Sequence, residues 1–232
     1  MHEILSNEIV ILALVIGLYL AAVKIYKKTG IAVLHPVPLC IGFLIFILSI
    51  SHIDYASFKK SSKMIDFMLG PAVVALGLIL YEQFEHVKKN YKSILVSLFA
   101  GSLSGILSVG TIAYLFGADK ILIASLAPKS VTTPIAIGIS ERFGGLPGLT
   151  AVIVVLVGVL GGIIGPYVLR KLGVESKIAK GLAMGASAHG LGMTRAIEIG
   201  AIEGALSGLA IVLTGLMTAI LIPILSLILY SI

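Results

Sequence analysis

Long uninterrupted runs of apolar residues dominate the pattern along this chain. The apolar positions follow one another without the every-second-residue alternation of a half-buried strand, so the runs predict helices. A helix that crosses a bilayer needs about 20 mostly apolar residues. Six runs are expected to span a membrane: Ile9–Val23, Ile31–Ile53, Phe67–Tyr81, Ser93–Ala118, Phe143–Leu169 and Gly204–Ile232.

Two further apolar stretches, Lys120–Arg142 and Lys177–Glu203, are broken in the middle by proline, glycine and polar residues. An unsatisfied backbone group is costly in lipid, so such a break is tolerated only where protein or a water-filled cavity surrounds it. Broken backbone at membrane depth is how many transporters build solute sites. The residues expected to break helices are Pro71, Pro128, Pro134, Gly190 and Gly192.

Composition supports the membrane interpretation. Of the 232 residues, 58% are hydrophobic and only 12% are charged, whereas soluble domains carry about 25% charged residues. The lack of tryptophan argues against a β-barrel with aromatic girdles. Lys24, Lys27 and Lys28 follow the first run, which therefore predicts a first spanning helix rather than a cleaved signal peptide. We expect an all-α, multi-pass protein of the cell membrane.

Positive charge marks the cytoplasmic ends of spanning helices and so predicts the topology. With the N-terminus outside, the clusters at residues 24–28, 88–92 and 170–180 all fall inside only if each broken stretch enters and leaves on one side. The prediction is six spans plus two re-entrant segments, one from each face. Lys59, Lys60 and Lys63 fall outside, so Asp54–Asp66 is expected to be an amphipathic interfacial helix.

The chain also repeats itself at an offset of 57 residues. Thr150, Gly158 and Pro166 recur as Ser207, Gly215 and Pro223, and upstream Ala136 resembles Ala196. We expect one membrane domain over 1–232, with N-terminal spans in 1–118 that serve partly as scaffold. Two repeated units, 119–170 and 177–232, then have opposite orientation, as in transporters with inverted repeats. Chance matching of small and apolar letters remains an alternative.

The first break carries a cation and three hydroxyl groups: Lys129, Ser130, Thr132 and Thr133. A buried ammonium needs a partner or a cavity, so Lys129 is a candidate counter-charge for an anionic solute, or else it extends to the membrane interface. The hydroxyl groups can bind a carboxylate, a solute hydroxyl or a cation, or bond to their own backbone. Thr133 is the expected N-cap of a half-helix whose N-terminus favours anions.

The second break offers His189, Thr194 and Arg195. Histidine titrates near neutral pH, so His189 is either a proton carrier or a structural side chain. Arg195 can hold a carboxylate with its guanidinium fork, or it pairs with Glu198 three positions on. His189 and Glu198 are the candidates for proton coupling. The predicted solute-binding residues are Lys129, Ser130, Thr132, Thr133, His189, Thr194 and Arg195.

Other kinds of chemistry have little support in the residues. The five histidines are scattered and Cys40 is the only cysteine, so no metal site is expected. Without a Walker motif or a well-placed catalytic triad, the sequence predicts neither a cofactor nor an enzyme. The net charge of +6 is interpreted as a topology signal, because no basic face on a soluble domain exists that would bind nucleic acid. The expected partners so far are membrane lipid and a small solute.

Three motifs resemble the LrgB/CidB family over nearly the whole chain: Phe67-Met68-Leu69-Gly70-Pro71-Ala72-Val73-Val74-Ala75-Leu76, Pro128-Lys129-Ser130-Val131-Thr132-Thr133-Pro134-Ile135-Ala136-Ile137 and Ala179-Lys180-Gly181-Leu182-Ala183. The following Ser187-Ala188-His189 and Arg195-Ala196 also fit the family pattern.

The resemblance implies two functions. Bacterial members are holin/antiholin-like proteins that modulate murein hydrolase export and autolysis, often beside a smaller LrgA/CidA partner. Chloroplast relatives are similar to glycolate/glycerate transporters, and some bacterial members are tied to pyruvate uptake. Paired hydroxyl-plus-cation breaks favour transport of a small carboxylate anion with alternating access, with His189 or Glu198 as the candidates for coupling to protons. A homodimer formed through the scaffold is expected by analogy only. The alternative is the holin/antiholin-like role.

Overall fold

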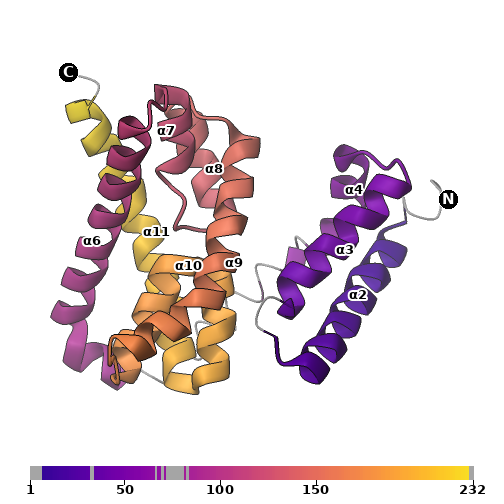
Figure 1. The fold of residues 1–232 in the computed structure, drawn as a ribbon, viewed down its shortest axis with the longest axis horizontal. Coiled ribbons are helices and arrows are strands. Elements are labelled where there is room, and N and C mark those ends of the chain that lie inside the picture. Colours follow the sequence, from indigo (N-terminus) through magenta and orange to yellow (C-terminus); the bar gives the residue numbers. More distant parts are fainter. Residues whose placement is uncertain are drawn as a thin grey trace. The chain divides into compact units, whose positions relative to one another are not determined.

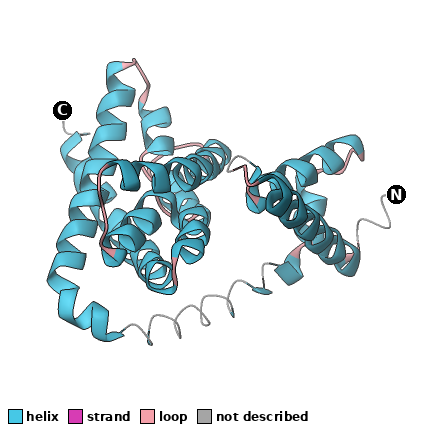
Figure 2. Cartoon of the chain, turned by 60° about the horizontal axis from the view of Figure 1, so that its bottom comes forward, coloured by secondary structure: helices cyan, strands magenta, loops and turns pink. Residues whose placement is uncertain are grey.

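The computed structural model describes residues 7–31, 34–65, 67, 68, 71, 81 and 84–229. Every regular element within these ranges is a helix, which confirms the predicted all-α class (Figure 2). The chain divides into two compact units, residues 1–77 and 78–232. Of the predicted span Phe67–Tyr81 only four residues are described, so the expected break at Pro71 stays a prediction.

The N-terminal unit contains α2 (Glu8–Thr29), α3 (Pro36–Ile50) and α4 (Tyr55–Ser61). The Asn7 side chain accepts the Ile9 N–H to begin α2, and Gly30 ends it with a φ of 63°, a conformation that glycine adopts without strain. The short helix α4 turns 119° from α3. It lies within the range where an interfacial helix is expected, and its position at a membrane surface stays a prediction.

The C-terminal unit contains six described helices (Figure 1): α6 (Phe84–Leu115), α7 (Lys120–Leu126), α8 (Thr133–Arg142), α9 (Pro147–Lys171), α10 (Lys177–Ile199) and α11 (Ala201–Leu229). Asp119 and Ser176 cap the starts of α7 and α10 with their side chains. Pro134 and Pro147 stand in the first turns of α8 and α9, where a missing N–H removes no helical hydrogen bond.

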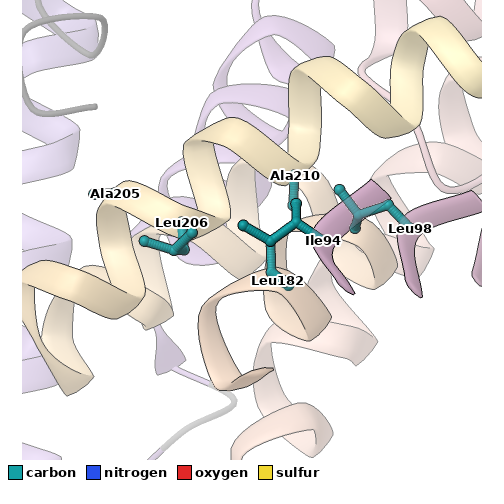
Figure 3. Packing of buried hydrophobic residues seen from close by; sticks show 6 residues of the cluster. All are labelled: Ile94, Leu98, Leu182, Ala205, Leu206 and Ala210. Atoms are coloured by element: carbon teal, nitrogen blue, oxygen red, sulfur yellow. The ribbon is translucent and has the colours of Figure 1, made fainter. Parts of the chain in front are cut away.

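The core of this unit forms where α6, α10 and α11 meet. Figure 3 shows Ile94 and Leu98 of α6 against Leu182 of α10 and Leu206 and Ala210 of α11, all buried. A second cluster joins Ile106 of α6 to Leu221 and Ile222 of α11, and Ala127, Ile139 and Phe143 pack against it. The second cluster therefore attaches the α7–α8 segment to the two long helices.

Four described helices are long and apolar enough to cross a membrane: Glu8–Thr29, Lys88–Leu115, Pro147–Lys171 and Ala201–Ser226. The bent pair α3 and α4 gives a fifth if it is counted as one span. Many large apolar side chains on these helices are exposed, for example Leu156 and Leu216. Soluble monomers rarely expose such extended apolar surface, so lipid is the solvent that these faces fit.

Candidate functional site

The first break joins α7 to α8. The Lys129 ammonium donates a hydrogen bond to Ser130 Oγ at 3.0 Å, and among the described residues no carboxylate pairs with it. Val131 is 1% exposed and packs with Ala136 of α8 and Val154 of α9. Thr132 precedes the first residue of α8, so the expectation that Thr133 caps this helix is wrong. Thr132 has the extended backbone of a cap residue, with a φ of −65° and a ψ of 149°, although its side chain makes no capping hydrogen bond, and Thr133 is already helical.

A buried hydroxyl cluster joins the C-terminal ends of α7 and α8 to the start of α9. Thr150 Oγ1 of α9 lies 2.7 Å from Ser140 Oγ of α8 and 3.1 Å from the Ser125 carbonyl oxygen of α7. Ser125 Oγ in turn accepts the Leu146 N–H at 2.8 Å. Ser125, Ser140 and Thr150 are all fully buried. Helices α7 and α8 therefore form a hairpin, with Pro128–Thr132 at its tip, whose two arms both contact the start of α9.

The second break lies inside α10 at His189, which has a φ of 40° and a ψ of −126°. A positive φ is uncommon for a residue with a side chain and marks a strained position. The chain folds back here, because a methyl group added at Gly192 would overlap the carbonyl oxygen of Met184 and lie 2.9 Å from Ala188 Cβ. The two halves of α10 therefore form a second hairpin, and Gly192 allows their close approach.

Helix α9 holds both breaks. The Val154 carbonyl oxygen lies 3.0 Å from His189 Nε2, and since a carbonyl only accepts, Nε2 carries the hydrogen. Val154 also packs against Val131 at the first tip. A methyl group added at Gly158, one turn on, would lie 2.6 Å from His189 Cε1. The structure thus brings the two breaks together on one short stretch of α9.

The hydroxyl and cation of the second break have partners of their own. Thr194 Oγ1 donates to the Gly190 carbonyl oxygen at 3.0 Å, the backbone bond that serine and threonine commonly make in helices. The Arg195 guanidinium forms an ion pair with the Glu198 carboxylate. The ion pair is the alternative that the sequence left open for Arg195, whereas the backbone bond of Thr194 was not predicted. A solute role for Thr194, Arg195 and Glu198 stays a prediction.

An open cavity of about 710 Å³ lies between α6, the first half of α10 and the first tip. Of the predicted solute-binding residues, only Lys129 and Ser130 line it. Thr132, Thr133, His189, Thr194 and Arg195 do not line this cavity. The other polar residues on its wall are Asn90, Ser93, Ser97, Ser104, Ser108, Ser176 and Ser187. The first tip thus places its cation in a cavity rich in hydroxyl groups.

The serines of α6 are the residues that the sequence reasoning missed. Ser93, Ser97, Ser104 and Ser108 recur at helical spacing and share one face of α6. Small residues in a spanning helix usually indicate close helix packing. A methyl group added at Gly101 or Gly105 on the same face would meet nothing within 4 Å, so no described helix packs closely there. The helical period of serine in the sequence is the signal that could have found this face.

Residues 15–228 match the model of the LrgB-like family. The chain belongs to the LrgB-like family. It is 32% identical over 230 residues to the holin-like protein CidB of Staphylococcus epidermidis. The matched region covers 99% of this chain and all of that protein. The Bacillus cereus antiholin-like protein LrgB is 34% identical over 179 residues, 77% of this chain and 78% of the relative. The Bacillus subtilis protein YwbG is 36% identical over 217 residues, 94% and 96% of the two chains.

No solved structure matches the chain. The LrgB-like family and the four candidate spans confirm the expectation of a multi-pass protein of the cell membrane. The family match also confirms the resemblance that the proline-bracketed motif at Pro128–Pro134 indicated.

Proposed function

We propose that this protein is a secondary transporter of a small monocarboxylate or 2-hydroxycarboxylate, of the class of pyruvate, glycolate, glycerate and lactate, that works by alternating access. The observation that carries the proposal is a pair of helical hairpins whose tips meet on α9, beside a cavity in which Lys129 is the one cation among the described lining residues. Broken helices that line a cavity are what secondary transporters use to hold solutes.

Both arms of each hairpin contact the start of the long helix that follows it. In the first, Ser125 of α7 and Ser140 of α8 both bond to Thr150 near the start of α9. In the second, both ends of α10 contact the start of α11: Gly181 lies against Glu203, and Ile197 against Gly204. We interpret both as re-entrant segments, so that the six spans are α2, α3, residues 67–81, α6, α9 and α11.

The two hairpin-plus-helix units run in opposite directions. The first half of α10 is parallel to α11 and antiparallel to α9, so α9 and α11 are antiparallel. The pairs that set these directions are Gly181 with Glu203, Gly185 with Ser207, Gly161 with Ala188 and Gly165 with Met184. Opposed units of this kind support the predicted inverted repeat, in which one sequence plan is inserted from both faces of the membrane.

The contacts between the units are reciprocal. Gly158 of α9 approaches His189 at the second break, and Gly215 of α11 approaches Ile135, just after the first break: a methyl group added at Gly215 would lie 2.9 Å from Ile135 Cδ1. Gly158 and Gly215 are equivalent under the 57-residue offset. Each break therefore contacts the long helix of the other unit. Through these contacts the two units would exchange conformations during alternating access.

The proposed solute site centres on Lys129, whose ammonium has hydrogens left to donate after its bond to Ser130. A carboxylate held there gains a charge-assisted hydrogen bond. Arg195 takes part only if it leaves Glu198. Proton coupling through His189 or Glu198, a homodimer and a small LrgA/CidA-like partner complete the proposal as predictions.

The second candidate function is a holin-like or antiholin-like role in murein hydrolase export and autolysis. The names of the relatives support it directly, since one is called holin-like CidB and another antiholin-like LrgB. These names favour the second candidate over the transporter, whereas the hairpins and the cavity favour the transporter. The two differ in one measurable property, because a carrier passes its solute without making the membrane leaky.

The deciding experiment uses the purified full chain in liposomes loaded with a fluorescent dye. Labelled pyruvate, glycolate and lactate are offered with and without a pH gradient, and dye release is followed in the same vesicles. We expect saturable uptake without dye release, and loss of uptake in Lys129→Met. Dye release without selective uptake would refute the transporter and support the holin-like role.

A further inference from the structure

Positive charge gathers where α6 and α10 begin. Residues 84–93 and 170–180 hold seven cations against two carboxylates, those of Glu85 and Glu175. Within the part of the chain that the structure describes, none of the seven forms an ion pair. The cations are Lys88, Lys89, Lys92, Arg170, Lys171, Lys177 and Lys180, of which Lys180 is partly buried and the others are exposed. We call this part of the unit the basic end.

The cavity between α6 and α10 reaches the basic end, and two of the lysines border it. Ser93 of α6 and Ser176 of α10 both line the cavity. Lys89 stands four residues before Ser93, and Lys180 stands four residues after Ser176. Residues four apart are neighbours on a helix surface, so one ammonium from each helix can reach an anion held between the two serines.

Hydrogen-bond donors accompany the lysines at this end of the cavity. Ser176 Oγ accepts the Ala179 N–H at 3.4 Å, which leaves the hydroxyl hydrogen to donate, and the Asn90 amide carries two N–H hydrogens. Ser97, one turn deeper than Ser93, donates to the Ile94 carbonyl oxygen at 3.0 Å and so offers the cavity an acceptor. Cations and donors therefore come first, with an acceptor behind them.

An apolar path leads away from Lys89 along the same side of α6. Val96 and Ala100 follow Lys89 by seven and eleven residues, which are two and three helical turns, and both are exposed. At 1.5 Å per residue the path from Lys89 to Ala100 is about 16 Å long. This length is close to half of the roughly 30 Å hydrocarbon core of a bilayer, so the path matches the acyl chain of a lipid in one leaflet.

We propose that the basic end binds an anionic phospholipid whose headgroup carries hydroxyl groups, of the class of phosphatidylglycerol. Lys89 and Lys180 hold the phosphodiester, Ser176 donates a hydrogen bond to it, and Ser97 accepts one from a glycerol hydroxyl. One acyl chain lies against Val96. Basic pockets between spanning helices are typical sites for anionic headgroups. The lipid site lies at the opposite end of the cavity wall from the first tip and does not depend on the proposed transport function.

The test is native mass spectrometry of the full chain in detergent, titrated with dioleoyl phosphatidylglycerol or dioleoyl phosphatidylcholine. We expect tighter binding of phosphatidylglycerol. The double variant Lys89→Gln with Lys180→Gln should weaken that binding about 25-fold, about fivefold for each lysine near the membrane surface. Binding of phosphatidylcholine, which has no net charge, should stay the same.

Lys92→Gln with Lys171→Gln is the matched control, because it removes the same charge from the same end. Lys92 is turned about 100° around α6 from Ser93, and its ammonium lies 5.9 Å from the Tyr91 ring centroid. This pair should weaken binding about twofold or less, since its charges act only from a distance. A second measurement leaves the lysines intact: Ser93→Cys in a Cys40→Ala background should react with a thiol reagent more slowly in phosphatidylglycerol than in phosphatidylcholine.

Three results would overturn the lipid site. The first is equal affinity for the two lipids, and the second is an equal loss of affinity in the two double variants. The third is protection of the cysteine at position 93 by glycerol 3-phosphate as strong as that by phosphatidylglycerol, which would show a site for soluble phosphate instead. None of these readouts measures uptake, so failure of the lipid site and failure of the proposed transport are separate results.

Discussion

Gly192 is the residue on which the fold-back of α10 depends most directly. A methyl group placed there would overlap the Met184 carbonyl oxygen and lie 2.9 Å from Ala188 Cβ. The carbonyl oxygen belongs to the backbone, so it cannot rotate away as the end of a side chain does. Gly192→Ala is therefore expected to force the two halves of α10 apart and to weaken the hairpin.

The size of the effect follows from two opposing contributions. Overpacking of a close contact costs about 1–3 kcal/mol, and the upper end applies because backbone must move. Replacing a helical glycine by alanine returns up to about 1 kcal/mol. The net loss in the free energy of unfolding is then about 2 kcal/mol, which lowers the melting temperature by about 4–8 °C for a chain of this length.

Gly190 provides a control two residues away in the same break. A methyl group there meets nothing within 4 Å, so Gly190→Ala should be neutral or slightly stabilising. The assay is thermal unfolding of the detergent-solubilised protein, followed by far-UV circular dichroism, for both variants and wild type. Equal melting temperatures for the two variants, or a lower one for Gly190→Ala, would refute the fold-back.

Two further predictions concern the first hairpin and the orientation of both. Thr150→Val keeps the shape of a fully buried side chain but removes the hydroxyl that binds Ser140 and Ser125, so it should lower the free energy of unfolding by about 1 kcal/mol. Ser207→Ala, at the equivalent position, removes a buried hydroxyl without a hydrogen-bond partner in the described structure and should cost less. In a cysteine-free background, single cysteines at Lys120 and Arg142 should label from one side of the vesicle and a cysteine at Lys180 from the other. Labelling of all three from one side would contradict the inverted repeat.

The broken helices are the part of the fold that the sequence predicted best. Proline removes a backbone donor and stops a helix, and α7 ends at Leu126, two residues before Pro128, whereas Pro134 lies in the first turn of α8. The second break was also expected near Gly190 and Gly192, but the residue with non-helical backbone is His189. Gly192 allows the two halves of α10 to approach closely. The strained backbone is that of His189, whose side chain is hydrogen-bonded to the Val154 carbonyl oxygen.

The wall of the cavity was much harder to predict. Serine in a spanning helix has the same local signature whether it faces another helix or a cavity, because in both cases it bonds to its own backbone. Only the position of the first tip beside Ser104 and Ser108 distinguishes the two. Likewise the sequence shows that Arg195 and Glu198 are three positions apart, but not that they form an ion pair. Side-chain partners depend on tertiary contacts that periodicity does not contain.

The two breaks are similar in backbone plan but differ in chemistry. The 60-residue offset that aligns Ala136 with Ala196 also aligns Lys129 with His189. Lys129 lines the open cavity, whereas His189 is buried and donates to the Val154 carbonyl oxygen. If the two units exchange conformations, as inverted repeats do, the cation at the first tip moves relative to a histidine that stays bound to α9. On the proposed transport function, solute selection would then belong to the first tip, and the second tip would mainly fix the position of α9 between them.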